Sequence, residues 1–173
     1  MPVYRRYFLP NSIVFITCVT KLRFPYLKSD LDLQLFWETE TFVNQIHPFN
    51  LLAYVIFPDR FHLLMDFDAG KAKFSIILHS LKRNFTNNYK KLHGIIQPIK
   101  LWQSCFWGHI IRDERDFKIH LDCIHWNPVK HQYVENPDDW KQSSFQKWLN
   151  DGLYEDGWRL EEKPGNSQKL FFE

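Results

Sequence analysis

Two periodicities of apolar residues run through the first part of the chain, and each predicts one kind of element. Segment 12–20 is rich in β-branched and aromatic residues, which is typical of a strand. From residue 31 to residue 46 apolar side chains recur at helical spacing, which predicts a helix with Asp30 as its N-cap. Pro48 follows and ends this pattern. The chain is thus expected to open with a strand and a helix.

The middle of the chain predicts a hairpin and a long amphipathic helix. Segments 51–57 and 61–67 are apolar enough to be strands, and the turn residues between them suit a tight hairpin. Over 74–92 the apolar residues recur three and four positions apart and form one continuous stripe. The opposite face of this helix carries pairs of basic residues, so it is expected to face solvent.

A last strand and a last helix complete the pattern. Segment 105–111 predicts the strand, and Asp113 is expected to cap a helix that ends near Trp126, before Asn127 and Pro128. The resulting order β-α-β-β-α-β-α predicts an α+β protein, a ferredoxin-like βαββαβ sandwich with one additional C-terminal helix. Residues 1–135 are expected to form the domain, and residues 136–173 a tail packed on it.

Charge is unevenly distributed although the net charge is only +2. Between residues 71 and 100 there are seven Lys or Arg residues and no Asp or Glu. Such a basic segment is typical of a surface that binds a polyanion, and a merely solvated helix face is the alternative that charge alone leaves open.

The cysteines and the apolar runs narrow the protein class. Cys18, Cys105 and Cys123 are far apart and odd in number, which favours reduced thiols over a disulfide framework or a structural zinc site. No apolar run approaches the roughly 20 residues needed to span a bilayer. A cytoplasmic protein without a membrane partner is therefore expected.

Four stretches together resemble one family, the REP-associated tyrosine transposases, which are relatives of the IS200-like transposases in the HUH single-strand nuclease superfamily. The resemblance covers nearly the whole chain, and the Asn-Pro-Val-Lys stretch in its context is its most specific part. The stretches are Tyr-Arg-Arg at 4–6, Phe-Pro-Asp-Arg-Phe-His-Leu-Leu at 57–64, Leu-Trp-Gln-Ser-Cys-Phe-Trp-Gly-His-Ile-Ile-Arg-Asp at 101–113, and His-Leu-Asp-Cys-Ile-His-Trp-Asn-Pro-Val-Lys-His at 120–131.

The resemblance implies a chemistry and a substrate. In this family two histidines on a strand and a polar residue on the last helix bind a divalent cation, Mg²⁺ or Mn²⁺. A tyrosine one turn earlier on that helix attacks a phosphate in single-stranded DNA. The implied substrate is a DNA hairpin with a single-stranded flank, and the implied assembly is a monomer or a homodimer. The acidic and aromatic tail from residue 151 onward is a candidate to occupy the site, as in relatives of this family.

Matched to the family motif, this chain departs at two of four positions. The metal pair falls on Arg60 and His62, the third ligand on Asn127, and the nucleophile on Cys123. A guanidinium has no lone pair for a metal, although it can bind a phosphate with two hydrogen bonds. Cys123 is either a buried, inert thiol or a thiolate with a lowered pKa. Asn127 is either a ligand or a residue that ends the helix.

The residues expected to contact DNA are basic side chains and one histidine, and His109 has a packing role as its alternative. Aromatic residues such as Tyr4, Trp102 and Trp107 are candidates to stack on unpaired bases. The expected DNA-binding residues are Arg5, Arg6, Arg60, Lys82, Arg83, Lys90, Lys91, His109, Arg112 and Lys130.

Three functions follow from these observations. The first is a DNA-binding, transposase-like protein that is impaired in strand cleavage by Arg60 and Cys123. The second is an active single-strand endonuclease, which uses Cys123 or a metal held by His62 and Asn127, with zinc shared by these three residues as one version. The third is a non-catalytic domain that binds another protein.

Overall fold

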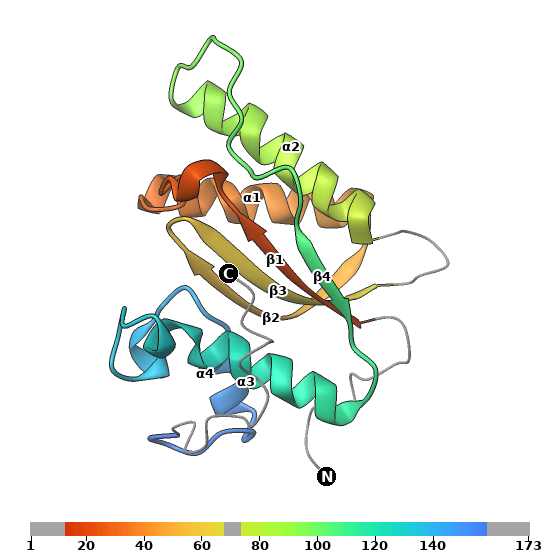
Figure 1. The fold of residues 1–173 in the computed structure, drawn as a ribbon, viewed down its shortest axis with the longest axis vertical. Coiled ribbons are helices and arrows are strands. Elements are labelled where there is room, and N and C mark those ends of the chain that lie inside the picture. The colour runs from red at the N-terminus through yellow and green to blue at the C-terminus, as the bar shows by residue number, and fades with distance from the viewer. Residues whose placement is uncertain (1–12, 68–73, 159–173) are drawn as a thin grey trace.

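A four-stranded antiparallel sheet forms the centre of the protein, with the strands in the order β2-β3-β1-β4. The computed structural model describes residues 13–67 and 74–158 (Figure 1). All neighbouring strands pair antiparallel, and β4 is an edge strand that pairs only with β1 in the described residues. The strands are β1 (Ile13–Val19), β2 (Phe49–Phe57), β3 (Arg60–Phe67) and β4 (Trp107–Ile110).

Helices cover both faces of this sheet (Figure 1). The connections β1-α1-β2 and β3-α2-β4 place α1 and α2 side by side on one face, while α3 and α4 lie on the other. The ferredoxin-like prediction with an added helix is thereby confirmed. The helices are α1 (Asp30–Ile46), α2 (Phe74–Leu92), α3 (Glu114–Lys130) and α4 (Phe145–Asn150), with short 3₁₀ turns at Lys21–Arg23 and Pro137–Asp139. Within the described residues no helix is both long and apolar enough to cross a membrane.

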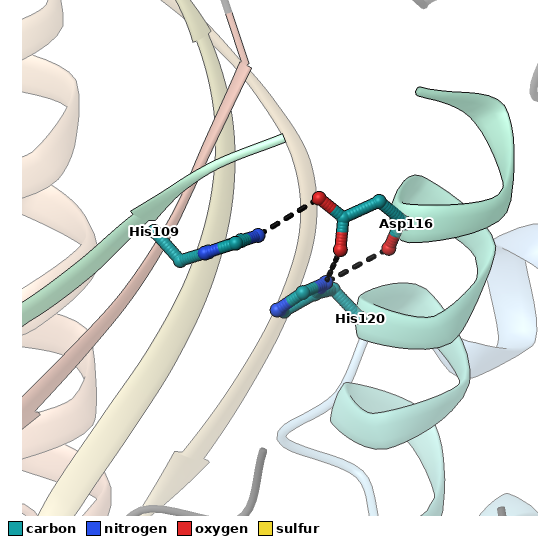
Figure 2. Close-up of side chains that lie close together, drawn as sticks. All are labelled: His109, Asp116 and His120. Carbon is teal, nitrogen blue, oxygen red and sulfur yellow. Dashed lines mark hydrogen bonds and ion pairs between the residues drawn. The ribbon is translucent and has the colours of Figure 1, made fainter. Parts of the chain in front are cut away.

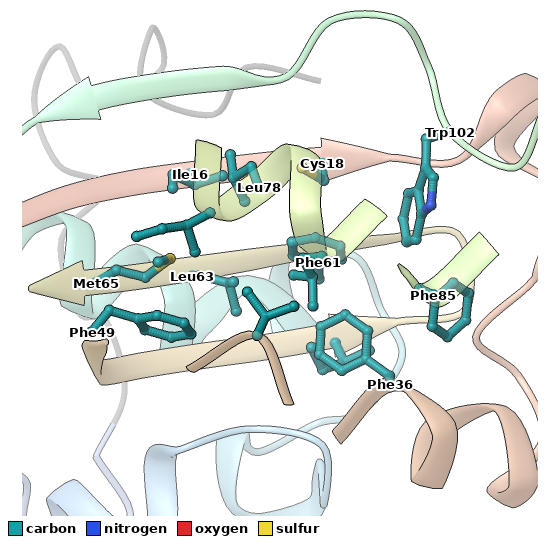
Figure 3. Packing of buried hydrophobic residues seen from close by; sticks show 14 of the residues in the cluster. Ile16, Cys18, Phe36, Phe49, Phe61, Leu63, Met65, Leu78, Phe85 and Trp102 are labelled. Atoms are coloured by element: carbon teal, nitrogen blue, oxygen red, sulfur yellow. The ribbon is translucent and has the colours of Figure 1, made fainter. Parts of the chain in front are cut away.

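Each strand serves both layers because successive side chains point to opposite faces of a sheet. On β1, Val14 and Ile16 pack toward α1 and α2, while Phe15 packs toward α3. Figure 3 shows the α1/α2 core, in which aromatic rings such as Phe36 and Phe61 lie 5.1 Å apart. The same alternation on β3 turns the even-numbered side chains toward α3.

The C-terminal segment belongs to the second core. Phe145, Trp148 and Tyr154 are buried in the same cluster as residues of β1, β2 and α3. The Trp148 indole N–H donates a hydrogen bond to the backbone carbonyl of Leu52, 2.9 Å away. Residues up to 158 therefore pack on the sheet and on α3, and residues 159–173 lie outside the described residues.

The start and end of two helices differ from the sequence predictions. Ser29, not Asp30, caps α1, because the Ser29 hydroxyl accepts the backbone N–H of Asp32. Asp113 caps α3 as expected. However, α3 continues through Pro128 to Lys130, and the predicted end near Trp126 is wrong. An interior proline costs about 3 kcal/mol, and the burial of Asn127 and Pro128 against the rest of the fold offsets this cost.

The last strand is shorter than segment 105–111. Only residues 107–110 pair with β1, and Cys105 is exposed. Beyond the paired residues, single hydrogen bonds from the main-chain N–H groups of Ile111 and Gln103 to Ile13 and Val19 continue the contact with β1.

Candidate functional site

Two sets of polar side chains face each other between β3 and α3. On β3, His62 and Arg60 point toward α3, and both are buried. On α3, the residues at positions 116, 120, 123 and 127 share the face that packs on the sheet, because they are spaced by four, three and four residues. Asn127 and Cys123 of this face are buried as well. The fold thus brings the four motif positions to the same layer, and Arg60, His62, Cys123 and Asn127 are called the predicted site below.

His62 is fixed as a neutral imidazole in this layer. Its Nδ1 atom lies 2.8 Å from the hydroxyl of Thr17 on β1, and its ring stacks on Phe15 with centroids 5.8 Å apart. Burial, followed by the positive charges of Arg60, His131, Lys130 and Arg23, lowers the pKa of His62 to about 3. The side chains around His62 therefore create a positive electrostatic potential, which repels a cation.

Arg60 is held by a carboxylate of its own turn. Its Nη1 atom lies 2.7 Å from Oδ1 of Asp59, and its guanidinium lies over the ring of Phe57, 4.3 Å from the centroid. The other oxygen of Asp59 binds Nη1 of Arg23 at 3.2 Å. Asp59 thus bridges two arginines, and the Nη1 atom of Arg60 is already used for binding a carboxylate.

The predicted site does not fit the divalent cation that the resemblance implies. Arg60 offers no lone pair, and four positive groups act on the remaining histidine. Two buried atoms in this region, Nε2 of His62 and Oδ1 of Asn127, have no hydrogen-bond partner among the described residues. The positive charges around His62 oppose a cation at this place, while Oδ1 of Asn127 is an acceptor and requires a donor as its partner.

Cys123 has the properties of a buried thiol. Its side chain is 5% exposed, and burial followed by the charge of Asp122 raises its pKa to about 12. This is the opposite of the lowered pKa that a thiolate nucleophile requires. Burial of Cys123 therefore favours the inert thiol over the poised thiolate beside Arg60.

A second polar cluster occupies the N-terminal half of the same face of α3 (Figure 2). His109 comes from β4, and Asp116 and His120 come from α3. Nε2 of His109 lies 2.8 Å from Oδ2 of Asp116, and Nδ1 of His120 lies 3.2 Å from Oδ1 and 2.8 Å from the main-chain oxygen of Asp116. These three residues are called the Asp116 cluster below.

Arg112 and the aromatic neighbours complete this cluster. The main-chain N–H and the Nε–H of Arg112 both donate to Oδ2 of Asp116, at 3.0 and 3.1 Å. Burial raises the pKa of Asp116, but hydrogen bonds from Arg112 and His109 outweigh it and lower that pKa to about 2. The rings of His109 and His120 stack with centroids 4.6 Å apart, and Trp107 stacks on the other face of His109.

From the sequence, His109 was a candidate for DNA contact or packing, and neither Asp116 nor His120 was a candidate site residue. The structure shows that Asp116 joins the two histidines. A signal was present, because Asp116 and His120 are four residues apart on a helix and share a face. The contribution of His109 was not visible in the same way, since it depends on how β4 lies against α3.

The residues predicted to bind DNA fall on two opposite faces of the sheet. Arg83 and Lys91 are exposed on α2, and Lys90 is half-buried there, whereas Arg112 and Lys130 are exposed at the two ends of α3. Lys82 donates a hydrogen bond to the main-chain oxygen of Gln103. The edge strand β4 lies between these two groups (Figure 1). Arg5 and Arg6, with Tyr4, lie outside the described residues.

Trp102, which was expected to stack on an unpaired base, is buried and not accessible to DNA. It is 4% exposed, and its indole N–H donates to the main-chain oxygen of Lys82. Trp102 is a core residue of the α1/α2 layer (Figure 3). Trp107 is partly exposed and remains a candidate.

Comparisons with known proteins agree over nearly the whole chain. A Haemophilus influenzae protein named "Putative REP-associated tyrosine transposase" is 33% identical over 165 residues, which cover 91% of this chain and 93% of that protein. The REP-associated tyrosine transposase of Escherichia coli is 31% identical over 158 residues, 91% of each chain. A solved structure of a REP-associated tyrosine transposase bound to a REP hairpin superposes with a TM-score of 0.74 at 30% identity, over 92% of both chains. No family model matches the chain.

Proposed function

The chain belongs to the REP-associated tyrosine transposases, and from this premise we propose that it binds a DNA hairpin with a single-stranded flank but is impaired in cutting it. The observation that carries the DNA-binding part is the solved relative with a REP hairpin, which matches 92% of this chain. The impairment is inferred from two residues: Arg60, which is paired with Asp59 at a metal-ligand position, and Cys123, which is a buried thiol at the nucleophile position.

The nucleophile position supports the loss of cleavage. A strand transfer by covalent catalysis needs an activated oxygen or sulfur that reaches the phosphate. The thiol of Cys123 is buried and stays protonated at neutral pH, because its pKa is about 12. At pH 7 the thiolate fraction is on the order of one in 10⁵, which follows from that pKa. Cys123 is therefore a poor substitute for the tyrosine of the family.

The metal position supports the same conclusion. A metal ion would polarise the scissile phosphate, but Arg60 cannot ligate it, and its charge opposes a cation next to His62. Lys130 is exposed at the end of α3, and its charge, together with those of Arg60 and Arg23 that Asp59 bridges, supports a phosphate contact near this place. The site retains the capacity to hold the DNA backbone and lacks the groups that would break it.

The test is a DNA assay with labelled hairpins that carry single-stranded flanks, in the presence of Mg²⁺ or Mn²⁺. Binding is measured as a function of salt, and nicking is measured on the same samples. The unaltered protein is compared with the double variant Arg60→His/Cys123→Tyr, which restores the family residues. Each single variant serves as a control for the other.

The expected result is salt-sensitive binding without nicking by the unaltered protein, and nicking by the double variant. Nicking by the unaltered protein would contradict the impairment and would show that the active site works by another arrangement, and Cys123→Ala and His62→Ala would then show whether these two residues take part. An absence of binding to any hairpin would contradict the DNA-binding function and favour a domain that binds a protein partner.

A further inference from the structure

We propose that the Asp116 cluster of His109, Asp116 and His120 binds a divalent transition-metal ion, at a place distinct from the predicted site. This inference does not depend on the proposed DNA-binding function. Two imidazoles and one carboxylate are a donor set that Zn²⁺ and its first-row neighbours use, with a fourth position left for water. The three residues come from two elements that the fold holds together, so the site forms only in the folded protein.

The spacing of the donor atoms fits one ion. One ligand atom from each of the three residues lies within 4.8 Å of the others. Nε2 of His109 lies 2.8 Å from Oδ2 of Asp116, somewhat less than the roughly 3.3 Å between neighbouring ligands of a tetrahedral ion with bonds of about 2.0–2.1 Å. Figure 2 shows both rings directed at the same carboxylate. Binding of an ion therefore requires the three ligand atoms to close around it, mainly by movement of the His109 ring, which is the most exposed of the three.

The charges around the cluster differ from those around His62. The first turn of α3 carries the acidic residues Glu114 and Asp116, and Asp113 precedes them as the N-cap. Arg112 is the basic side chain that contacts the carboxylate, and it is 74% exposed, so it can turn into solvent when an ion enters. Along one face of α3, a cation is thus repelled near Asn127 and accepted near Asp116.

The hydrogen bonds of the Asp116 cluster are compatible with replacement of the Arg112 side chain by an ion. The main-chain N–H of Arg112 stays on Oδ2 of Asp116 and orients the carboxylate, as outer-shell partners of metal ligands do. Nδ1 of His120 donates to the main-chain oxygen of Asp116, which leaves the lone pair on Nε2, and Nε2 has no partner among the described residues. His109, whose side chain is 23% exposed, is the ligand of this cluster that solvent reaches.

The alternative is a cluster held by hydrogen bonds alone, and a metal titration separates the two. The full-length protein, freed of metal by a chelator, is titrated with Co²⁺ and followed by its visible absorption, and then with Zn²⁺ in competition. The variants are Asp116→Asn and His109→Ala. The matched control is His93→Ala, because His93 forms a similar pair with Asp32 at 2.7 Å but has no third ligand within the part of the chain that the structure describes. Thermal melting checks that each variant is folded.

The expected result is one Co²⁺ per chain with the absorption of a tetrahedral site, displaced by Zn²⁺. Asp116→Asn and His109→Ala should weaken binding by about 100-fold, at least the loss that removal of an outer-shell partner causes, while His93→Ala binds as the unaltered protein does. If Asp116→Asn does not fold, His109→Ala alone decides, since His109 is the most exposed ligand. Absence of Co²⁺ binding would overturn the proposal. So would binding that survives His109→Ala and is lost in His62→Ala, because the ion would then lie at the predicted site.

Discussion

Nε2 of His125, on α3, lies 2.9 Å from the hydroxyl of Ser144, the residue before α4. The opposite nitrogen, Nδ1, lies 3.0 Å from the hydroxyl of Tyr154, which donates to Asp122 at 2.8 Å. Since the tyrosine hydroxyl donates elsewhere, Nδ1 carries the proton of a neutral imidazole, and Nε2 accepts from Ser144. This buried histidine therefore ties the C-terminal segment to α3.

The buried histidines predict that the protein loses stability in mild acid. Burial and nearby positive charges lower the pKa of both His62 and His125 to about 3, whereas an unfolded histidine has a pKa of about 6.5. The unfolded chain then takes up more protons below pH 6.5, so the stability is complete above that pH and falls as the pH drops toward 3. Between pH 7 and pH 5 the two residues together should cost about 4 kcal/mol of unfolding free energy.

Urea unfolding at several pH values measures this loss. His125→Gln should remove roughly half of the pH dependence of the two histidines, although it also lowers stability at pH 7 because the imidazole hydrogen bonds are removed. His79→Gln is the control, because His79 is exposed on α2. Equal stability of the unaltered protein at pH 7 and pH 5 would contradict the buried, neutral state of both histidines.

The cysteines should differ sharply in reactivity. Burial raises the pKa of Cys18 and Cys123 to about 12, while Cys105 is exposed. At pH 8 a thiol reagent such as DTNB is expected to modify one cysteine of the native protein rapidly and all three after denaturation. Cys105→Ser should abolish the rapid phase. A rapid phase that persists in this variant and disappears in Cys123→Ala would mean that Cys123 is an accessible thiolate.

The ion pair between Asp59 and Arg60 predicts that the loss of its carboxylate lowers the stability of the protein. Asp59→Asn leaves the charge of buried Arg60 without its carboxylate, which should lower the unfolding free energy by about 3 kcal/mol. Arg23→Gln removes the other, half-exposed partner of Asp59 and should cost less than about 1 kcal/mol. Chemical denaturation of both variants gives the comparison. Equal losses of unfolding free energy in the two variants would show that the Asp59 carboxylate does not compensate the buried charge of Arg60.

The two groups of basic residues predict how DNA runs over the surface. If the hairpin and its flank pass around β4, both groups neutralise phosphates. The triple variant Arg83→Gln/Lys90→Gln/Lys91→Gln and the double variant Arg112→Gln/Lys130→Gln should then each reduce the slope of log K against log salt. The expected reduction is about 0.7–0.9 for each phosphate that is no longer neutralised.

Fluorescence anisotropy over a range of salt concentrations gives these slopes. Lys147→Gln is the control, because Lys147 is exposed on α4 and belongs to neither group. An unchanged slope in the triple variant would remove α2 from the DNA-binding surface. An unchanged slope in the double variant would remove the α3 side instead.

The sequence by itself determined the elements, their order and the family. Strands and helices differ in the period of their apolar residues, and this period survives in the sequence because each element buries one face. The hairpin of β2 and β3, the stripe of α2 and the Asp113 cap could all be predicted for this reason. The motif positions Arg60, His62, Cys123 and Asn127 could also be placed, since strand alternation and helical spacing define which side chains share a face.

Only the tertiary structure decided the chemical state of those residues. The pKa of Cys123 and of His62 depends on burial and on charges from other elements, which no local pattern records. The joining of His109 to Asp116 depends on how β4 lies against α3, and the continuation of α3 through Pro128 depends on packing that offsets a missing hydrogen bond. Local periodicity fixes elements, whereas desolvation and long-range packing fix what their side chains can do.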